Sequence, residues 1–244
     1  MEKTCVIVQA RVGSTRLPNK VLMDLCGRPV LWHVLNRLRK SQLISGIIIA
    51  TTILPDDDAI QQFCEENDAA FYRGSSENVL SRYYEAAQKY DVKRIIRITS
   101  DCPVIDPVLI DEMIKEFEKS GADYLSNSIV RTFPRGLDTE IFPFRVLEQV
   151  FYEAAKPHEL EHVTPYIYQH PELFKLQNFA GEIDYSALRW TLDTEEDYRL
   201  IKEIYDALYE ENGMFYWKDV LKLFNEKPEL AEINRHIEQK KLGG

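Results

Sequence analysis

The sequence predicts an α/β protein built on a mostly parallel β-sheet with helices on both faces. Three observations support this prediction: β-branched runs alternate with helical patterns, several of the runs are continuously apolar, and two of them end on an aspartate. Continuously apolar strands are typical of sheets that are covered on both faces. Strands that alternate with helices form parallel βαβ units, whose ligands bind at the carboxyl ends of the strands.

The composition fits one globular domain over residues 1–244. The chain is 45% hydrophobic and 29% charged, which provides an ample core. Its formal net charge of −10 argues against general binding to nucleic acid or to an anionic membrane, because both need a basic face. No apolar run approaches the roughly 20 residues that span a bilayer, and the chain enters a strand without a signal peptide. We therefore expect a cytoplasmic protein.

The four cysteines are predicted to be buried free thiols. They are widely spaced and form no C-x-x-C pair, and each lies in an apolar or element-embedded context: Cys5, Cys26, Cys64 and Cys102. Reduced thiols are consistent with the cytosol.

The first predicted strand, over residues 5–9, leads into a loop that could bind an anion. The loop carries one glycine, two hydroxyls and three cations: Arg11, Gly13, Ser14, Thr15, Arg16 and Lys20. A glycine lets backbone N–H groups approach an anion, and a triphosphate would suit the charges. The pattern matches neither G-x-G-x-x-G nor G-x-x-x-x-G-K-[ST], and a solvated structural loop is the alternative. A helix is expected to follow, over residues 29–35.

The elements up to residue 126 continue the alternation. Strands are predicted at 46–52, 69–74, 94–101 and 122–126. Between them, helices are expected to begin near Pro55, after a cap at Ser75 or Ser76, and at the Asp106-Pro107 pair.

From residue 127 the rhythm changes, and we predict an insertion on the sheet at about 128–185. It contains a short extended segment near 139–142, helical patterns near 146–151 and 158–170, and alternation near 174–179. A further strand is predicted at 188–193. Helices at about 194–240 are expected to close the chain.

Asp101 and Asp193 each end a predicted strand, so a parallel sheet would bring both to the edge where the first loop lies. Mg²⁺ favours one or two carboxylates together with water and substrate oxygens. The two acids are therefore candidate magnesium ligands. Strand-end aspartates also serve as turn formers or helix caps, and Thr194 is an alternative cap for the helix that follows.

A second metal motif lies at residues 158–162. His158-Glu159-Leu160-Glu161-His162 matches H-E-x-x-H, which places two imidazoles on one helix face as zinc ligands. The motif is short, prolines limit the helix, and no extended zinc-protease pattern follows. A zinc hydrolase is therefore a minor alternative, and Glu161 or His162 could instead line a substrate pocket or simply pack.

Ordered blocks of the sequence resemble the sugar cytidylyltransferases, a family that includes the CMP-KDO and CMP-sialic acid synthetases. The likeness extends through about residue 200 and is greatest to the branch of the spore-coat polysaccharide protein SpsF. The blocks that carry it are residues 8–20, 27–31, 73–75, 100–103 and 192–197.

The resemblance implies a Rossmann-like (GT-A-like) nucleotidyltransferase, usually dimeric, that joins CTP to an acidic sugar and releases pyrophosphate. It implies triphosphate contacts in the first loop, with Lys20, Arg11 and Arg16 as the catalytic cations. The implied nucleotide contacts are Ala10, Arg11, Gly13, Ser14, Lys20, Arg73, Ser75 and Arg82. The implied magnesium ligands are Asp101 and Asp193.

The acceptor and the partner subunit are expected at the insertion, where Arg135, Asp138, Glu140 and His162 are the candidate acceptor contacts. An acidic sugar or a phosphorylated small molecule would suit Arg135. Cys102 stands where the KDO branch has a glutamate, and the segment 75–78 also differs, which leaves the acceptor and the base open.

Two other functions keep the same fold. A sugar-nucleotide-dependent glycosyltransferase would need Asp-x-Asp after a strand, and the run Asp56-Asp57-Asp58 contains that pattern but opens a helix. A nucleotide-binding module without turnover is the other alternative.

Overall fold

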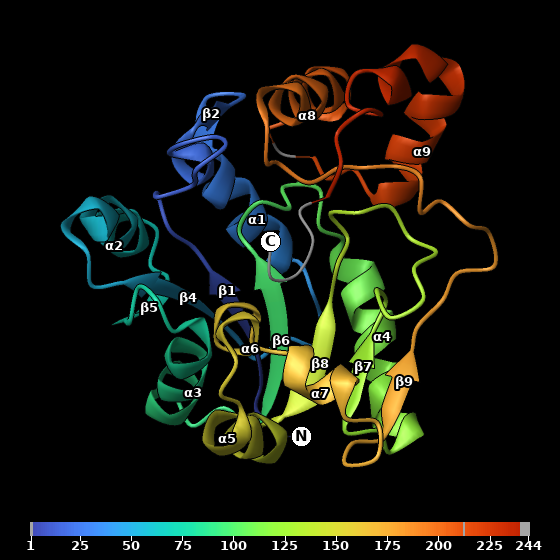
Figure 1. The fold of residues 1–244 in the computed structure, drawn as a ribbon. Coiled ribbons are helices and arrows are strands. Elements are labelled where there is room, and N and C mark those ends of the chain that lie inside the picture. Colours follow the sequence, from blue (N-terminus) through green and yellow to red (C-terminus); the bar gives the residue numbers. More distant parts are fainter. Residues whose placement is uncertain (1, 212, 240–244) are drawn as a thin grey trace.

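The computed structural model describes residues 2–211 and 213–239 (Figure 1). A seven-stranded sheet runs through its centre in the order β5-β4-β1-β6-β8-β7-β9. The strands are β1 (Thr4–Gln9), β4 (Gly46–Thr52), β5 (Ala70–Gly74), β6 (Arg94–Thr99), β7 (Tyr124–Ser126), β8 (Glu140–Pro143) and β9 (Leu176–Asn178). A small hairpin of β2 (Asp24–Leu25) and β3 (Arg28–Pro29) stands apart. The predicted α/β class is confirmed.

The parallel half of the sheet follows from its apolar strands. β1 pairs in parallel with β4 and β6, and β4 pairs in parallel with β5. Val6, Ile7 and Val8 of β1 are fully buried because helices cover both faces of this strand. β6 ends at Thr99, two residues before the predicted end, so Asp101 lies in the turn beyond the strand.

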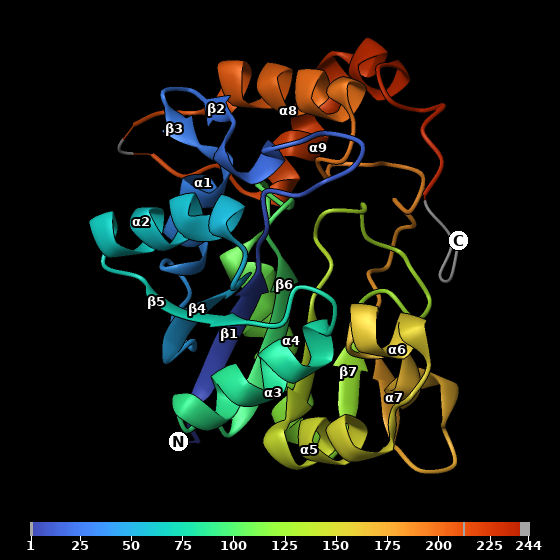
Figure 2. The ribbon, with the colours of Figure 1, turned by 60° about the vertical axis from the view of Figure 1, so that its left-hand side comes forward.

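Helices cover both faces of the sheet and enclose one apolar core on each (Figure 2). One core includes residues of α1 (Val30–Leu38), α2 (Asp58–Glu66), α4 (Pro107–Ser120), α8 (Glu195–Leu208) and α9 (Trp217–Glu226). The other includes residues of α3 (Val79–Lys89), α5 (Phe144–Glu153) and α7 (Pro165–Gln169), beside α6 (Pro157–His162). Both views place α8 and α9 beyond the end of the sheet where β1 and β6 finish.

The predicted insertion contributes two strands to the sheet. β8 lies between β6 and β7 and is antiparallel to both, with Arg97 opposite Glu140. β9 pairs in parallel with β7. Because β8 runs against β6, its first residue lies at the carboxyl end of β6.

The predicted strand at 188–193 is wrong. Leu192 N–H donates to the Asp101 carbonyl (2.8 Å), and Trp190 N–H donates to the Arg135 carbonyl (2.6 Å), so this segment pairs with loops and not with the sheet. A single bridge joins Arg135 to Arg189. Trp190 is nevertheless fully buried, which explains why the sequence pattern imitates a strand.

The N-caps of α3 and α8 differ in how well they match the caps predicted from the sequence. Asn78, and not Ser75 or Ser76, caps α3 by accepting from Ser81 N–H (2.9 Å). Thr194 caps α8 in a reciprocal capping box with Asp197, as the alternative interpretation of that segment expected.

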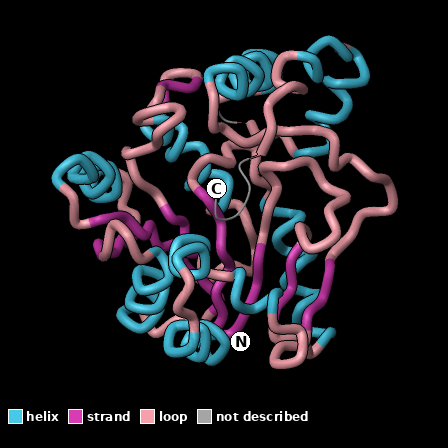
Figure 3. Tube along the Cα trace, viewed as in Figure 1, coloured by secondary structure: helices cyan, strands magenta, loops and turns pink. Residues whose placement is uncertain are grey.

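Long loops connect β7 and β9 to the elements that follow them. Figure 3 shows two long loops, from β7 to β8 and from β9 to α8, which correspond to residues 127–139 and 179–194. In the described ranges, no helix combines the length and the apolar character needed to cross a bilayer. Cys5, Cys64 and Cys102 are buried free thiols as predicted, whereas Cys26 is only half-buried.

Candidate functional site

A cleft of about 790 Å³ opens at the carboxyl ends of β1 and β6. The first loop, the turn after β6 and the insertion all line it. The structure brings most of the predicted site residues to this cleft: Ala10, Arg11, Ser14, Arg16, Lys20, Arg82, Asp101, Arg135, Asp138, Glu140, His162 and Asp193. Residues that are more than 180 positions apart in the sequence therefore meet in one cavity.

The first loop is held open by a buried acid that the sequence analysis missed. Asp57 accepts from Val12 N–H (2.8 Å) and from the Thr52 hydroxyl, and its side chain is buried. Ser14 N–H and Asn19 N–H both donate to the Val12 carbonyl, which bends the loop around this anchor. The acidic run at 56–58 was the signal, but it predicts a helix start and does not identify which acid turns inward.

Lys20 lies between the two predicted magnesium ligands. Its Nζ donates to Asp101 Oδ2 (2.7 Å) and to Asp193 Oδ1 (2.8 Å). Arg16 also pairs with Asp193, through Oδ2 (3.0 Å). The two carboxylates, 20% and 15% exposed, therefore line the cleft as neighbours that share Lys20.

The charges of this cluster reinforce one another. Burial alone would lower the pKa of Lys20, but Asp101 and Asp193 raise it well above its usual range. Burial would raise the pKa of Asp101, but Lys20 holds it below its usual range. Lys20 and Asp101 are therefore both ionised at neutral pH.

The two acids fit a magnesium site of the kind that is completed by substrate. Mg²⁺ is commonly held by one or two carboxylates and by phosphate oxygens, and both acids supply hard oxygen donors at the cleft. The described part of the chain contains no group of three or more His, Cys, Asp or Glu side chains that could hold a metal by itself. Oxygens from a ligand would therefore have to complete the coordination.

Arg189 and Asp197 support Asp193 from behind. Arg189 Nη2 donates to Asp193 Oδ2 (2.9 Å) and to Asp197 Oδ2 (2.9 Å). Asp197 is fully buried and also accepts from the backbone N–H groups of Asp193 (3.0 Å) and Thr194 (3.2 Å). Sequence reasoning assigned neither residue a role at the site.

Arg82 is a buried cation with unused hydrogen-bond donors. It is 2% exposed, and its Nε and Nη1 have no hydrogen-bond partner among the residues that the structure describes. Burial lowers its pKa, and the nearby charge of Arg11 adds to this effect. Gly74 makes room for it, because a Cβ there would lie 2.8 Å from Arg82 Cγ. A guanidinium buried without acceptors is costly, so a ligand acceptor would stabilise it.

Three predicted nucleotide contacts lie outside the lining of the cleft. Arg73 donates to the carbonyls of Thr52 (2.8 Å) and Leu54 (2.9 Å) and pairs with Asp58, so it fastens β5 to the start of α2. The Ser75 hydroxyl accepts backbone N–H groups in the turn before α3. A Cβ on Gly13 would meet open space, so the protein alone does not require glycine there.

The insertion side of the cleft contains two ion pairs and one further cation. Glu140 accepts from Arg97, from the Tyr124 hydroxyl and from Thr164 Oγ1 (2.6 Å). Its oxygens are therefore already engaged, and it holds neighbouring side chains in place.

Asp138 is similarly engaged, by two nitrogens of Arg131. Burial lowers the pKa of Arg135, and the neighbouring charge of Arg131 lowers it further. His162 lines the same part of the cleft.

The H-E-x-x-H segment is poorly arranged for zinc. α6 is only six residues long, and Glu159 is buried as a cap that accepts from the N–H groups of Ala155 (3.1 Å) and Lys156 (3.0 Å). His158 is turned towards Gln169 (3.4 Å) and does not line the cleft, unlike His162. The structure therefore gives the zinc alternative no metal site within the described residues.

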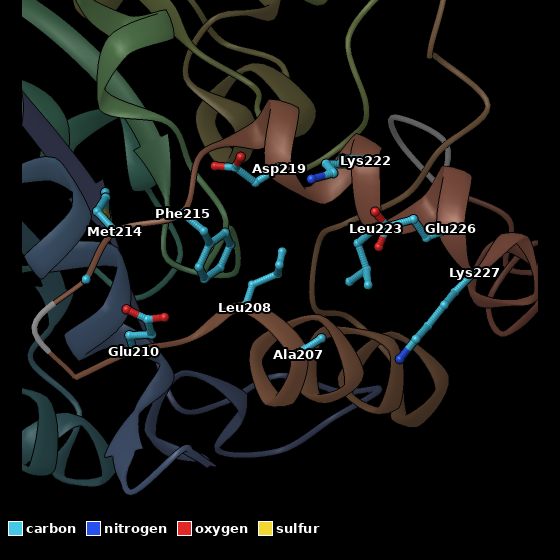
Figure 4. Close-up of a pocket in the computed structure, with 11 residues that line it drawn as sticks. Ala207, Leu208, Glu210, Met214, Phe215, Asp219, Lys222, Leu223, Glu226 and Lys227 are labelled. Carbon is cyan, nitrogen blue, oxygen red and sulfur yellow. The ribbon is translucent and has the colours of Figure 1, made fainter.

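A second pocket, of about 530 Å³, lies between the end of α8 and α9 (Figure 4). Its walls include Leu208, Phe215 and Leu223, with Lys222 and Glu226. None of the predicted site residues lines it, so the cleft at the strand ends is the candidate site.

Comparison with known proteins agrees with this site. A family model described as "Cytidylyltransferase" matches residues 5–237. The spore coat polysaccharide biosynthesis protein SpsF of Bacillus subtilis is 33% identical over 238 residues, which cover 95% of this chain and 98% of that protein.

Solved structures show the same fold. A cytidylyltransferase from Leptospira borgpetersenii superposes with a TM-score of 0.90 at 31% identity, over 99% of this chain and 100% of that one. A CMP:2-keto-3-deoxy-manno-octonic acid synthetase complexed with CTP shares the fold alone, with a TM-score of 0.63 and 16% identity over 84% and 99% of the two chains. The resemblance identified from the sequence blocks is thus confirmed, and the chain belongs to the cytidylyltransferase family of nucleotidyltransferase enzymes.

Proposed function

We propose that this enzyme transfers CMP from CTP to an acidic sugar, or to a related phosphorylated acceptor, and releases pyrophosphate. The observation that carries the proposal is Lys20, which is held 2.7 and 2.8 Å from two carboxylates in a cleft that also contains Arg11, Arg16 and Arg82. The likeness of the chain to SpsF supports a role for this enzyme in surface polysaccharide biosynthesis. A cytoplasmic location and a homodimeric state stay predictions.

The reaction forms a bond between an acceptor oxygen and the α-phosphorus of CTP, and it breaks the bond from that phosphorus to pyrophosphate. Positioning and charge stabilisation dominate such transfers. Lys20 and Arg11 would neutralise the charge on the transferred phosphate, and Arg16 would stabilise the pyrophosphate. Asp101 and Asp193 would hold Mg²⁺, which when bound supplies positive charge at the phosphate oxygens and can lower the pKa of the acceptor hydroxyl.

The acceptor is proposed to bind against the insertion. Arg135 would pair with a carboxylate or phosphate of the acceptor, because the other two arginines there already pair with Glu140 and Asp138. His162 would contact the same molecule. Glu140 would act indirectly, by holding Arg97 and Tyr124 in the wall of the cleft.

The glycosyltransferase alternative is less well supported. The two acids of the pattern, Asp56 and Asp58, are exposed residues absent from the lining of the cleft, and Asp58 pairs with Arg73. The Asp-x-Asp pattern at 56–58 therefore does not face the cleft, and it offers no second metal site there.

Thermal stabilisation by nucleotides tests the proposal. CTP with Mg²⁺ should raise the melting temperature more than UTP, GTP or ATP, because the proposed site binds CTP in preference to the other nucleotides. A ligand at 100 times its dissociation constant adds about 2.7 kcal/mol to the free energy of unfolding, which a melting curve resolves. Asp101→Ala should reduce this shift, whereas Asp56→Ala, which removes an exposed acid outside the cleft, should not. A CTP-selective shift would justify screening acidic sugars for pyrophosphate release. Absence of a shift with every nucleotide would contradict the proposal.

A further inference from the structure

The segment that follows α9 returns to the catalytic cleft. Asn234 is buried, and its Nδ2 donates to Asp197 Oδ1 (2.8 Å) and to the Arg189 carbonyl (2.9 Å). Five residues later, Gln239 Oε1 accepts from Arg189 Nη1 (2.7 Å), and Gln239 lines the cleft. Residues 234–239 thus contact the site through the same arginine at two points.

Arg189 links this segment to a predicted magnesium ligand. Its Nε and Nη2 bind the two oxygens of Asp197, its Nη2 also binds Asp193 Oδ2, and its Nη1 binds Gln239. All three nitrogens of the guanidinium are therefore used. Because a guanidinium is planar and rigid, the partner of Nη1 helps to set the direction in which Nη2 meets Asp193.

We propose that Gln239 is a positioning residue of the active site, which fixes Arg189 and through it the carboxylate of Asp193. The inference rests on the proposed function, because it assigns the segment 234–239 to the site that binds CTP with a divalent cation. Residues that orient ligating carboxylates contribute about tenfold or more to metal affinity.

The geometry separates this role from a nucleotide contact. Gln239 is bonded to Arg189, whereas the residues proposed to hold the triphosphate are Arg11, Arg16 and Lys20. Loss of the Gln239 amide should therefore weaken CTP binding where the divalent cation contributes to it. Binding of CTP without metal should change little.

Calorimetric titration of the full chain with CTP, once with Mn²⁺ and once with EDTA, tests the proposal. Gln239→Ala should bind CTP about tenfold more weakly than wild type with Mn²⁺ and within about twofold of it in EDTA. Gln239→Glu, which keeps an oxygen acceptor for Arg189, should bind CTP with Mn²⁺ at least as tightly as wild type. Gln149→Ala is the matched control, because Gln149 is a surface residue of α5 that bonds to Glu153.

The possible failures are distinguishable. If wild type binds CTP and Gln239→Ala keeps the wild-type affinity with Mn²⁺, the positioning role is refuted while the proposed function stands. Equal losses with Mn²⁺ and with EDTA would also overturn it, because they indicate a direct nucleotide contact or a general structural role. If wild type binds no CTP in either condition, the proposed function itself fails.

Discussion

Replacing Lys20 by methionine should make the stability of this enzyme depend on a divalent cation. Methionine keeps an unbranched side chain but removes the charge that lies 2.7 and 2.8 Å from Asp101 and Asp193. Removing one partner of a buried ion pair costs about 3–5 kcal/mol. Here the acids are partly exposed, and Asp193 retains Arg16 and Arg189, so we expect a smaller loss of about 2 kcal/mol.

A cation that occupies the vacated position should reverse this loss. Mg²⁺ at about 100 times its dissociation constant adds about 2.7 kcal/mol to the free energy of unfolding. The variant should therefore be less stable than wild type in EDTA and should recover in Mg²⁺. Wild type should respond little to Mg²⁺ alone, because Lys20 already occupies the position between the two acids and pairs with both.

Urea unfolding in EDTA and in Mg²⁺ measures both effects, and a pyrophosphate-release assay measures turnover. Turnover of the variant should be slower, because its activation barrier should rise by about 3 kcal/mol, the range for loss of one electrostatic stabiliser. Lys93→Met is the control: Lys93 pairs with Asp91 on the surface, where such pairs contribute about 0–1 kcal/mol. The reasoning is refuted if Lys20→Met matches wild type in EDTA, if both gain equally from Mg²⁺, or if its turnover is unchanged.

Three further predictions concern single residues. Burial lowers the pKa of His33 to about 4, so the folded state resists its protonation. The free energy of unfolding, measured in urea, should therefore be intact above pH 6.5 and fall by about 3 kcal/mol as the pH approaches 4. A variant without His33 that shows the same loss would contradict this. Gly13→Ala should leave the free energy of unfolding within about 0.5 kcal/mol of wild type, since its Cβ meets open space, while weakening CTP binding if the backbone approaches phosphate there. Gly136→Ala should cost about 2 kcal/mol or more, because φ is +107° and a Cβ would lie 2.6 Å from the Trp190 backbone; a melting temperature equal to wild type would refute that strain.

The sequence was sufficient to predict the parallel half of the fold and the acids of the cleft. β1 and β4 contain continuous apolar runs, because both of their faces are buried. This pattern can be recognised in the sequence without knowing which elements pack against the strands. Asp101 was placed correctly near Lys20 because the ends of parallel strands meet at one edge. Asp193 lies at the same edge for a different reason: its segment is not a strand of the sheet, but Leu192 N–H donates to the Asp101 carbonyl and so places Asp193 beside Asp101.

What the sequence could not supply was the choice of partner. The segment 188–193 is buried like a strand, but its hydrogen bonds go to loops at Asp101 and Arg135, and no local pattern distinguishes the two cases. Arg73 fits a nucleotide-contact block equally well, yet its guanidinium is used by the carbonyls of Thr52 and Leu54. The anchoring role of Asp57 depends on the fold of the first loop in the same way.

Under the proposed function, the position of β8 limits which parts of the insertion can be exchanged between relatives to change the acceptor. β8 is hydrogen-bonded between β6 and β7, so exchanging the whole insertion with that of a relative would replace a strand inside the sheet and disturb its pairing with β6. The loop at 127–139, which carries Arg131, Arg135 and Asp138 into the cleft, lies outside the ladder. We therefore expect that a change of acceptor by recombination or design would exchange only this loop and would keep the β8 of the recipient protein.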